Sequence, residues 1–179
     1  MNGVISLDRY AEAVELACGA ILGGGVIVYP TETLYGIGAN ALDAGAVELV
    51  ARVKRRPDRK PMLVIVRDAG AAAGLVASVP ASARALMEAF WPGPLTIVFP
   101  AAPGLPAGLT AGTGTIGVRV PSSPFCLALL RVCGVPVTST SANLAGEPPP
   151  RTTDAIRRAL GPAVRLYVDA GELPASPPS

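Results

Sequence analysis

Glycine and proline interrupt this apolar sequence so often that few of its helices or strands can be long. The 179 residues include 20 glycines and 19 prolines, while half of all residues are apolar. A chain of this length can bury one sizeable core, but its elements must end where proline or glycine recurs. The uncharged stretch 89–118 shows the limit, because five prolines and six glycines prevent one continuous membrane-spanning helix. We therefore expect a soluble protein built from short elements.

The segments between these breaks predict helices and strands in mixed order. Apolar spacing predicts helices at 6–23, 43–53, 69–77, 81–90, 123–134 and 153–160. Ser6, Asp43 and Ser123 are the expected N-caps. Short apolar runs predict strands at 26–29, 62–66, 95–99, 116–120, 135–138 and 164–168. This order predicts one α/β domain over residues 1–179, built on a mixed sheet, with a frayed or truncated tail from about residue 174.

The lack of histidine narrows the possible chemistry. With no His in the chain, Ser-His-Asp catalysis, Cys-His catalysis and His-ligated metals are excluded. Cys18, Cys126 and Cys133 match no metal spacing, and the last two are expected to share a buried helix face as inert core thiols. These thiols and the lack of a visible signal peptide predict a reduced, cytoplasmic location. The net charge of +2 predicts no global attraction to nucleic acid or membrane, so a local patch would be needed.

Residues 52–60 form the strongest local patch of positive charge. Six of the fifteen Lys and Arg residues lie in these nine positions, including both lysines, Lys54 and Lys60, against one acid, Asp58. One interpretation is a solvated helix end whose cations favour the C-terminal dipole. The other is a phosphate or RNA site, because clustered basic side chains neutralise polyanions. The charge pattern leaves both interpretations open.

Arg119 is the only charged residue between Ala89 and Leu130. It lies in a strand-like run that ends at Pro121, and a charge on an apolar strand is costly to bury without a partner. It could be an edge-strand arginine that reaches solvent, or a ligand for an anion between apolar walls. We favour the second interpretation. An unpaired cation of this kind would point into a cavity, and its removal would leave thermal stability unchanged or slightly raised.

Two polar segments follow buried strands, which is where ligands often bind in open α/β sheets. The segment 138–143, Thr-Ser-Thr-Ser-Ala-Asn, carries five hydrogen-bonding side chains, and 29–36 is a second polar loop. The first could instead be an ordinary capping or Ser/Thr turn, and the second is weak evidence by itself. The run 112–117 matches the pattern G-x-G-x-x-G, but it precedes a strand rather than opening a helix, so we reject a dinucleotide site there.

Five motifs, in order along the chain, carry a family resemblance. They are Pro30-Thr31-Glu32-Thr33-x-Tyr35-Gly36-x-Gly38, Lys54-x-Arg56 with Pro61 following, Trp91-Pro92-Gly93-Pro94-Leu95-Thr96, Gly117-Val118-Arg119-x-Pro121 and Ser139-Thr140-Ser141-Ala142-Asn143. Together they span about residues 5–170. In this order they resemble the YrdC-like family, whose enzymes make threonylcarbamoyl-adenylate. Each motif alone is modest evidence, but five in order are highly specific.

The resemblance implies a fold and a reaction. The fold would be a twisted mixed β-sheet with flanking helices around a large concave, electropositive cavity. The enzyme would be a nucleotidyltransferase that turns L-threonine, bicarbonate or carbon dioxide, and ATP into L-threonylcarbamoyladenylate and pyrophosphate. Mg²⁺ is expected to arrive with the triphosphate. Other proteins would transfer the threonylcarbamoyl group to adenosine 37 of tRNA, so those proteins and tRNA are expected partners, and a membrane is not.

The resemblance also assigns roles to individual residues. The catalytic set around the carbamate and the phosphates would be Lys54, Arg56, Ser141 and Asn143. The substrate- and ATP-binding set would be Thr31, Tyr35, Arg119 and Ser139. No resident metal is implied. Because negative charge is high throughout the reaction, catalysis would depend on positioning and on stabilisation by cations.

Two departures from the family pattern bear on these expectations. Met62 stands where the family usually has Leu, which is a tolerable apolar exchange. Family members also usually continue past Ser179 into a strand and an Arg-containing segment at the nucleotide site, so we expect a truncated chain or an altered ATP site. The alternative function is a non-catalytic RNA-binding or ribosome-associated module. A carbamoyl-adenylate-forming domain of the hydrogenase-maturation type shares the implied fold.

Overall fold

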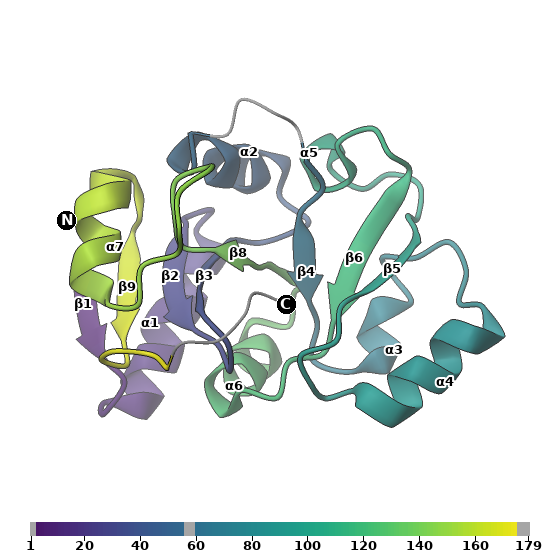
Figure 1. Ribbon diagram of the computed structural model, residues 1–179, viewed down its shortest axis with the longest axis horizontal. Helices are drawn as coiled ribbons and strands as arrows, with labels where there is room; N and C mark the ends of the chain where they lie inside the picture. Colours follow the sequence, from purple (N-terminus) through teal and green to yellow (C-terminus); the bar gives the residue numbers. More distant parts are fainter. Residues whose placement is uncertain (1–2, 56–59, 175–179) are drawn as a thin grey trace.

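The computed structural model describes residues 3–55 and 60–174, and its strands form two mixed sheets with helices around them (Figure 1). The helices are α1 (Tyr10–Leu22), α2 (Ala44–Val53), α3 (Ala69–Ala72), α4 (Ala81–Phe90), α5 (Ala107–Thr110), α6 (Pro124–Cys133) and α7 (Thr153–Leu160), with the 3₁₀ turn η1 (Gly161–Ala163) after α7. α1 packs against α6, and α2 packs against α5. The predicted α/β architecture, with mixed strand pairing and flanking helices, is confirmed.

The larger sheet joins segments from both ends of the chain. Its strand order is β1 (Gly3–Ser6), β9 (Leu166–Asp169), β2 (Ile27–Pro30), β3 (Tyr35–Gly38) and β8 (Thr140–Ser141). β1 and β2 pair in parallel with β9, whereas β3 pairs antiparallel with both β2 and β8. Because Gly36 pairs with Ser141, the polar segment 138–143 lies directly beside β3.

The smaller sheet contains much of the uncharged stretch of sequence. Its strand order is β5 (Ile97–Pro100), β6 (Thr115–Arg119), β4 (Leu63–Ile65) and β7 (Val137–Thr138). β6 is an inner strand, antiparallel to β5 and parallel to β4, and Arg119 at its end is opposite Ile65. Only Ser139 separates β7 in this sheet from β8 in the other. The two sheets therefore meet at Ser139.

Two apolar clusters fill the space between the sheets and the helices. One packs α1 and α6 against β2 and β9, and the other surrounds β4, β5, β6 and α2. β2 belongs to both, because successive side chains of a strand point to opposite faces. Ile27 and Tyr29 lie in the first cluster and Val28 in the second, and all three are buried. β2 therefore stands in a fixed position from which the next turn projects.

Two of the three capping residues expected from the sequence are confirmed. Asp43 accepts hydrogen bonds from two backbone N–H groups in the first turn of α2, at 2.8 and 3.1 Å. Ser123 accepts one from the first turn of α6 at 3.4 Å. The third expectation is wrong, because Ser6 ends β1 and α1 begins only at Tyr10. The Ser6 hydroxyl accepts a hydrogen bond from the N–H of Asp8 (3.2 Å), in the turn between strand and helix.

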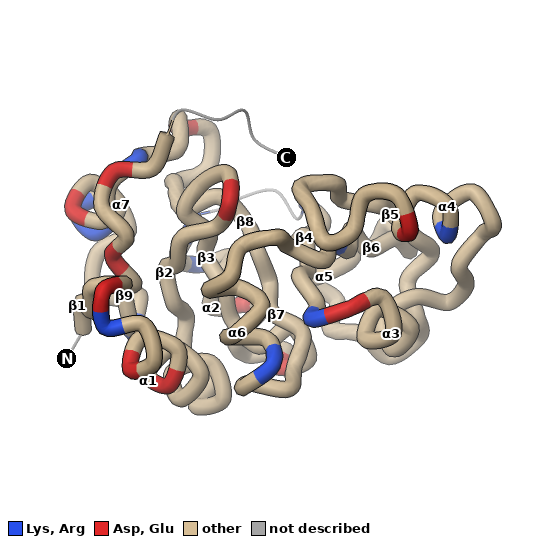
Figure 2. Tube along the Cα trace, turned by 90° about the horizontal axis from the view of Figure 1, so that it is seen from below, with Lys and Arg blue, Asp and Glu red and all other residues tan. Residues whose placement is uncertain are grey.

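Charge is unevenly distributed over the fold. Figure 2 shows charged residues mainly along α1 and α7, whereas the tube through β5 is tan. The uncharged stretch 89–118 folds as the end of α4, then β5, α5 and most of β6. Across residues 3–55 and 60–174, no helix combines the length and apolar character needed to cross a bilayer.

Candidate functional site

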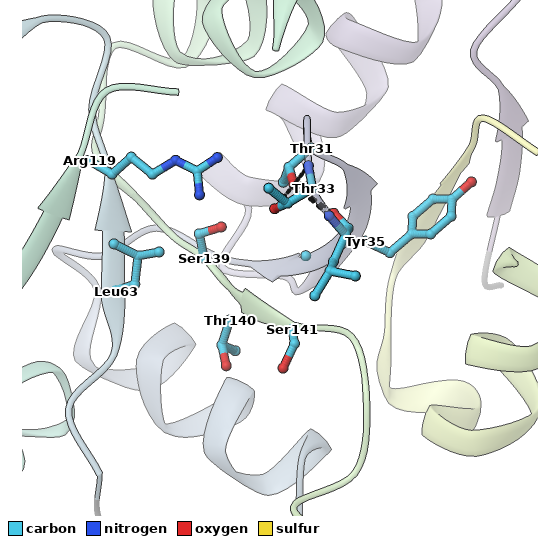
Figure 3. Close-up of a pocket in the computed structure, with 10 residues that line it drawn as sticks. Thr31, Thr33, Tyr35, Leu63, Arg119, Ser139, Thr140 and Ser141 are labelled. Atoms are coloured by element: carbon cyan, nitrogen blue, oxygen red, sulfur yellow. Dashed lines mark hydrogen bonds between the residues drawn. The ribbon is translucent and has the colours of Figure 1, made fainter. Parts of the chain in front are cut away.

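A pocket of about 210 Å³ lies where the two sheets meet (Figure 3). Three pieces of chain form its walls: the turn from β2 into β3, the ends of β4 and β6, and the segment that links β7 to β8. The lining residues are Thr31, Thr33, Leu34, Tyr35, Gly36, Leu63, Arg119, Ser139, Thr140 and Ser141. The fold thus brings both polar segments singled out in the sequence into one cavity, together with the lone arginine.

The turn between β2 and β3 is held by a threonine hydroxyl. Thr31 Oγ1 accepts hydrogen bonds from the backbone N–H groups of Thr33 and Leu34, both at 3.1 Å, and donates to the Leu34 carbonyl at 2.7 Å. Such a side-chain-to-backbone turn satisfies polar groups that no strand pairing reaches. Thr31 therefore shapes this wall of the pocket, and Thr33 lies beside it with its hydroxyl oxygen 3.2 Å from that of Thr31.

Tyr35 lines the pocket, but its hydroxyl group points away from it (Figure 3). The phenol donates a hydrogen bond to the Gly171 carbonyl (2.8 Å) and accepts one from the Ala170 N–H (2.9 Å). Burial raises the pKa of Tyr35, and the Asp169 carboxylate adds to the rise, while the hydrogen bond from Ala170 opposes it. The structure therefore uses the Tyr35 hydroxyl to fix the segment after β9, so a role of Tyr35 in holding threonine would fall to other atoms of this pocket-lining residue.

Arg119 lies in the pocket wall and has an acidic partner. Only 3% of the residue is exposed, its Nε donates to the Gly93 carbonyl at 3.1 Å, and its Nη2 forms an ion pair with Glu32. Both the edge-strand alternative and the expectation of an unpaired cation are wrong, because β6 is an inner strand and the β2–β3 turn supplies a carboxylate. The sequence also led us to expect that the loss of Arg119 would not lower stability. That expectation assumed that Arg119 has no acidic partner, so its premise is wrong as well.

Glu32 is the residue that sequence reasoning missed. Its Oε1 accepts hydrogen bonds from the Ser122 N–H (2.9 Å) and the Ser122 hydroxyl (3.2 Å), in addition to the ion pair with Arg119. Burial alone would raise the pKa of Glu32, but these hydrogen bonds and the Arg119 guanidinium outweigh burial and lower it. The signal in the sequence was an acid in a polar loop and a single cation in a neutral stretch, which could have been read as a pair.

Ser139 and Gly36 lie close to each other in the pocket lining. The Ser139 N–H donates to the Leu63 carbonyl at 2.7 Å, so this residue joins the β7–β8 segment to β4. A Cβ atom at Gly36 would lie 3.4 Å from Ser139 Oγ and 3.3 Å from Cζ of Tyr29. Burial raises the pKa of Tyr29, which is wholly enclosed behind them. Glycine at position 36 therefore leaves room for the Ser139 hydroxyl beside it.

Lys54, Ser141 and Asn143 form a second cluster beside the pocket. Lys54 caps the end of α2 and is only 4% exposed; its Nζ donates to the Ser141 carbonyl and to Asn143 Oδ1, the latter at 3.3 Å. The Ala145 N–H donates to the Lys54 carbonyl at 3.0 Å, which ties the same segments together a second time. The structure thus brings together three of the four residues predicted to be catalytic. The fourth, Arg56, lies outside the described residues.

The basic segment divides into buried and exposed parts. The interpretation of a solvated helix end fails for Lys54, which is buried, but it describes Arg52 and Arg55, which are exposed. Lys60 is also exposed but lies beyond the helix end. Among the basic residues of this segment that the structure describes, Lys54 is thus the one that is buried beside the pocket.

The cysteines lie away from the pocket lining, in the core. Cys126 and Cys133 are both buried on α6, as predicted, and Cys18 is buried on α1. Burial raises the pKa of Cys126 to about 12, so its thiol is protonated at neutral pH. No group of three Cys, Asp or Glu side chains that could hold a metal occurs in the part of the chain that the structure describes.

Comparison with known proteins gives one consistent answer. The Sua5/YciO/YrdC family model, described as Telomere recombination, matches residues 19–179. A Nitrosococcus oceani protein named threonylcarbamoyl-AMP synthase is 38% identical over 148 residues, which cover 83% of this chain and 80% of that protein. A Bacillus subtilis protein of the same name is 39% identical over 147 residues, or 82% of this chain, but only 42% of that protein.

A solved structure supports the same relationship. The crystal structure of Sua5 from P. abyssi, complexed with L-threonine, has a TM-score of 0.89 and 31% identity to this chain. The match covers 96% of this chain and 51% of that one. This chain therefore spans about half the length of that Sua5 and most of the length of the shorter N. oceani relative.

Proposed function

The chain belongs to the Sua5/YciO/YrdC family, and we propose that it is a nucleotidyltransferase that makes L-threonylcarbamoyladenylate. The substrates would be L-threonine, bicarbonate or carbon dioxide, and ATP, and pyrophosphate would be the second product. The observation that carries the proposal is the pocket itself. Its walls hold hydroxyl groups, a buried arginine and, directly behind Ser141, a buried lysine. Such a set suits an anionic amino-acid derivative and phosphates.

The proposed reaction has two bond-forming steps. The threonine amine attacks carbon dioxide and loses a proton, which gives a carbamate. A carbamate oxygen then attacks the α-phosphorus of ATP, and the bond to the departing pyrophosphate breaks. The first step creates an anion, and the second brings that anion to the triphosphate, so the protein contributes chiefly by holding the reactants and by placing cations near the developing charge. Neither step requires histidine.

The residues divide between the two ends of the proposed substrate complex. The β2–β3 turn with Thr31 and Thr33, and Arg119 opposite it, form the wall that would receive threonine, with Arg119 near its carboxylate. Lys54, Asn143 and Ser141, with Arg56, would surround the carbamate and phosphates. Ser139 lies between these two groups, where the sheets meet. Mg²⁺ would enter with the triphosphate, whose oxygens are ligands that this ion prefers.

The product defines the partners that we expect. A threonylcarbamoyl-adenylate is an activated acyl phosphate anhydride, so a second protein must accept it and transfer the acyl group. We propose that this transfer modifies adenosine 37 of tRNA and involves other proteins of tRNA threonylcarbamoylation, in the cytoplasm. A non-catalytic RNA-binding module remains the alternative, and it draws its support from the exposed Arg52 and Arg55 at the end of α2 and the exposed Lys60 farther along the chain.

Pyrophosphate release tests the proposal directly. With ATP, Mg²⁺ and bicarbonate, we expect pyrophosphate only when L-threonine is added, and a product with the mass of threonylcarbamoyl-adenylate. The matched control replaces Arg151, an exposed arginine that pairs with Glu172 away from the pocket lining, and Arg151→Ala should behave like the wild type. Equal pyrophosphate release without any amino acid would contradict threonine as substrate. No release at all, together with tight RNA binding, would favour the alternative.

A further inference from the structure

Glu32 connects two walls of the pocket that come from different sheets. It lies in the β2–β3 turn of the larger sheet, and its carboxylate reaches Arg119 and Ser122 at the end of β6 in the smaller sheet. Its side chain is 18% exposed, and that of Arg119 is 4% exposed. One oxygen, Oε1, receives all of these contacts. The link is therefore largely enclosed, and it joins the β2–β3 turn to the end of β6.

The same contacts fix the orientation of the Arg119 guanidinium. The Gly93 carbonyl accepts from Nε at 3.1 Å, and Glu32 pairs with Nη2. A guanidinium is planar and its N–H groups form a rigid fork, so two partners on different nitrogens determine its plane. The Gly93 carbonyl holds the Nε side of the group. Glu32 supplies the second point of attachment.

From these contacts we infer that Glu32 is a positioning residue for threonine binding, which acts through Arg119 and by holding the β2–β3 turn at a fixed distance from β6. This inference rests on the proposed function. Glu32 would not itself touch the reacting atoms. Its contribution is to keep the Arg119 guanidinium and the wall that contains Thr31 in the arrangement that receives the substrate carboxylate.

Two conservative variants separate position from charge. Glu32→Gln keeps the length of the side chain and an oxygen that can accept from Ser122 and Arg119, but it removes the negative charge. Glu32→Asp keeps the charge but draws the carboxylate back by one methylene, so it cannot reach both partners in the same geometry. If position is what matters, the KM for threonine rises by a few fold in Glu32→Gln and by about tenfold or more in Glu32→Asp and Glu32→Ala, the scale of one charged hydrogen bond. The kcat value should change less.

The experiment measures KM and kcat of pyrophosphate release, together with calorimetric binding of L-threonine. Glu172→Gln, which removes an exposed partner of Arg151 outside the pocket lining, is the matched control and should keep the KM of the wild type. A double-mutant cycle with Arg119→Ala supplies a readout that a merely structural role would not move. If Glu32 acts through Arg119, Glu32→Ala adds little to the rise in KM already caused by Arg119→Ala.

Each other outcome overturns the inference in a recognisable way. Better threonine binding by Glu32→Asp than by Glu32→Gln would show that charge matters rather than position. Wild-type KM in all three variants, or fully additive effects in the cycle, would show that Glu32 only stabilises the fold. A wild-type protein that neither binds threonine nor releases pyrophosphate would overturn the proposed function, and this inference with it, and so is distinct from the other results.

Discussion

The site contains two buried cations whose partners differ. Arg119 and Lys54 are almost equally enclosed, at 3% and 4% exposed. Arg119 is paired with a carboxylate, that of Glu32, whereas Lys54 donates to the carbonyl of Ser141 and the amide oxygen of Asn143. A carboxylate offsets the charge of its partner, while neutral oxygens stabilise a cation through their dipoles.

This difference suggests a division of labour within one pocket. On the Arg119 side, an ion pair holds the guanidinium in place and offsets its charge. The planar group therefore contributes oriented hydrogen-bond donors more than additional positive charge. The Lys54 side brings a compact ammonium group against neutral acceptors, which suits attraction of phosphate oxygens as the reaction proceeds. We therefore expect the loss of Lys54 to be felt mainly in turnover and the loss of Arg119 mainly in substrate binding, while both losses lower stability.

The largest effect should come from Lys54. Replacing it by Ala should lower kcat/KM for pyrophosphate release by ~10²-fold or more, the scale of removing one preorganised electrostatic donor. Arg56→Ala should fall in the same range if that residue shares the role that the family resemblance implies. The matched control is Arg84→Ala, an exposed cation on α4, which should retain the kinetics of the wild type.

The stability of the Lys54 variant sharpens this reading. Without the ammonium, the Ser141 carbonyl and Asn143 Oδ1 each lose a donor, which costs about 1–3 kcal/mol where such groups are buried. Lys54→Met keeps most of the apolar volume and loses the charge, so it should be as inactive as Lys54→Ala but better packed. Full activity in both variants would show that Lys54 only joins α2 to the segment after β8, and the division of labour would be wrong.

Arg119→Ala should also lower stability, because it removes the partner of a carboxylate. The change leaves the half-buried Glu32 carboxylate without its guanidinium, and we expect a loss of about 2 kcal/mol. For a chain of this length that corresponds to a fall of about 4–8 °C in Tm. Arg151→Ala is the matched control, because its pair with Glu172 is exposed and such pairs contribute about 0–1 kcal/mol.

The order of the Arg119 variants provides the second test. Threonine binding should weaken from the wild type to Arg119→Lys to Arg119→Ala, because lysine keeps the charge and loses the planar fork. The double variant Arg119→Ala with Glu32→Ala should be less destabilised than the sum of the two single changes, since both partners of the pair are then absent. An Arg119→Ala protein as stable as the wild type would mean that the ion pair contributes nothing to stability. The different partners of Arg119 and Lys54 would then have no energetic consequence.

Local signals in the sequence predicted much of the fold. The helices capped by Asp43 and Ser123 and the helix Thr153–Leu160 begin where the sequence places them, because a cap and the apolar face lie within a few residues of each other. β3 and β8 were not predicted. In the sequence of β3, Tyr-Gly-Ile-Gly, the two glycines weaken the strand signal. Packing accounts for the glycine at position 38, because a Cβ atom there would lie 2.6 Å from the Tyr29 ring.

The sequence indicated which residues belong to the site, but not which partners they contact. Family motifs indicated Lys54, Ser141 and Asn143, which the structure brings together, but no local pattern specified that Arg119 would meet Glu32. Contacts between segments about 90 residues apart depend on how the two sheets meet. The same holds for Tyr35, whose hydroxyl group binds a segment more than 130 positions away. Partner choice for a buried polar group is a property of the tertiary fold.

The smallest expected effect is a pH dependence that belongs to the Arg119 side alone. The pKa of Glu32 is lower in the folded protein than in the unfolded chain, so its ionised form stabilises the fold. That contribution is complete above the unfolded value, about 4.3, and it disappears as the pH falls through the lowered folded value. Thermal unfolding of the wild type and of Glu32→Gln should therefore differ most at neutral pH, and the two curves should converge as the solution becomes more acidic than the unfolded pKa.

Asp68, whose pKa is also lowered, chiefly by a hydrogen bond from the Ala71 N–H, is present in both proteins and cancels in the comparison. The convergence should be weaker when both proteins carry Arg119→Ala, because the guanidinium is one of the groups that lower the Glu32 pKa. A constant difference in Tm from neutral to acid pH would show that Glu32 stabilises this wall by its shape and not by its charge.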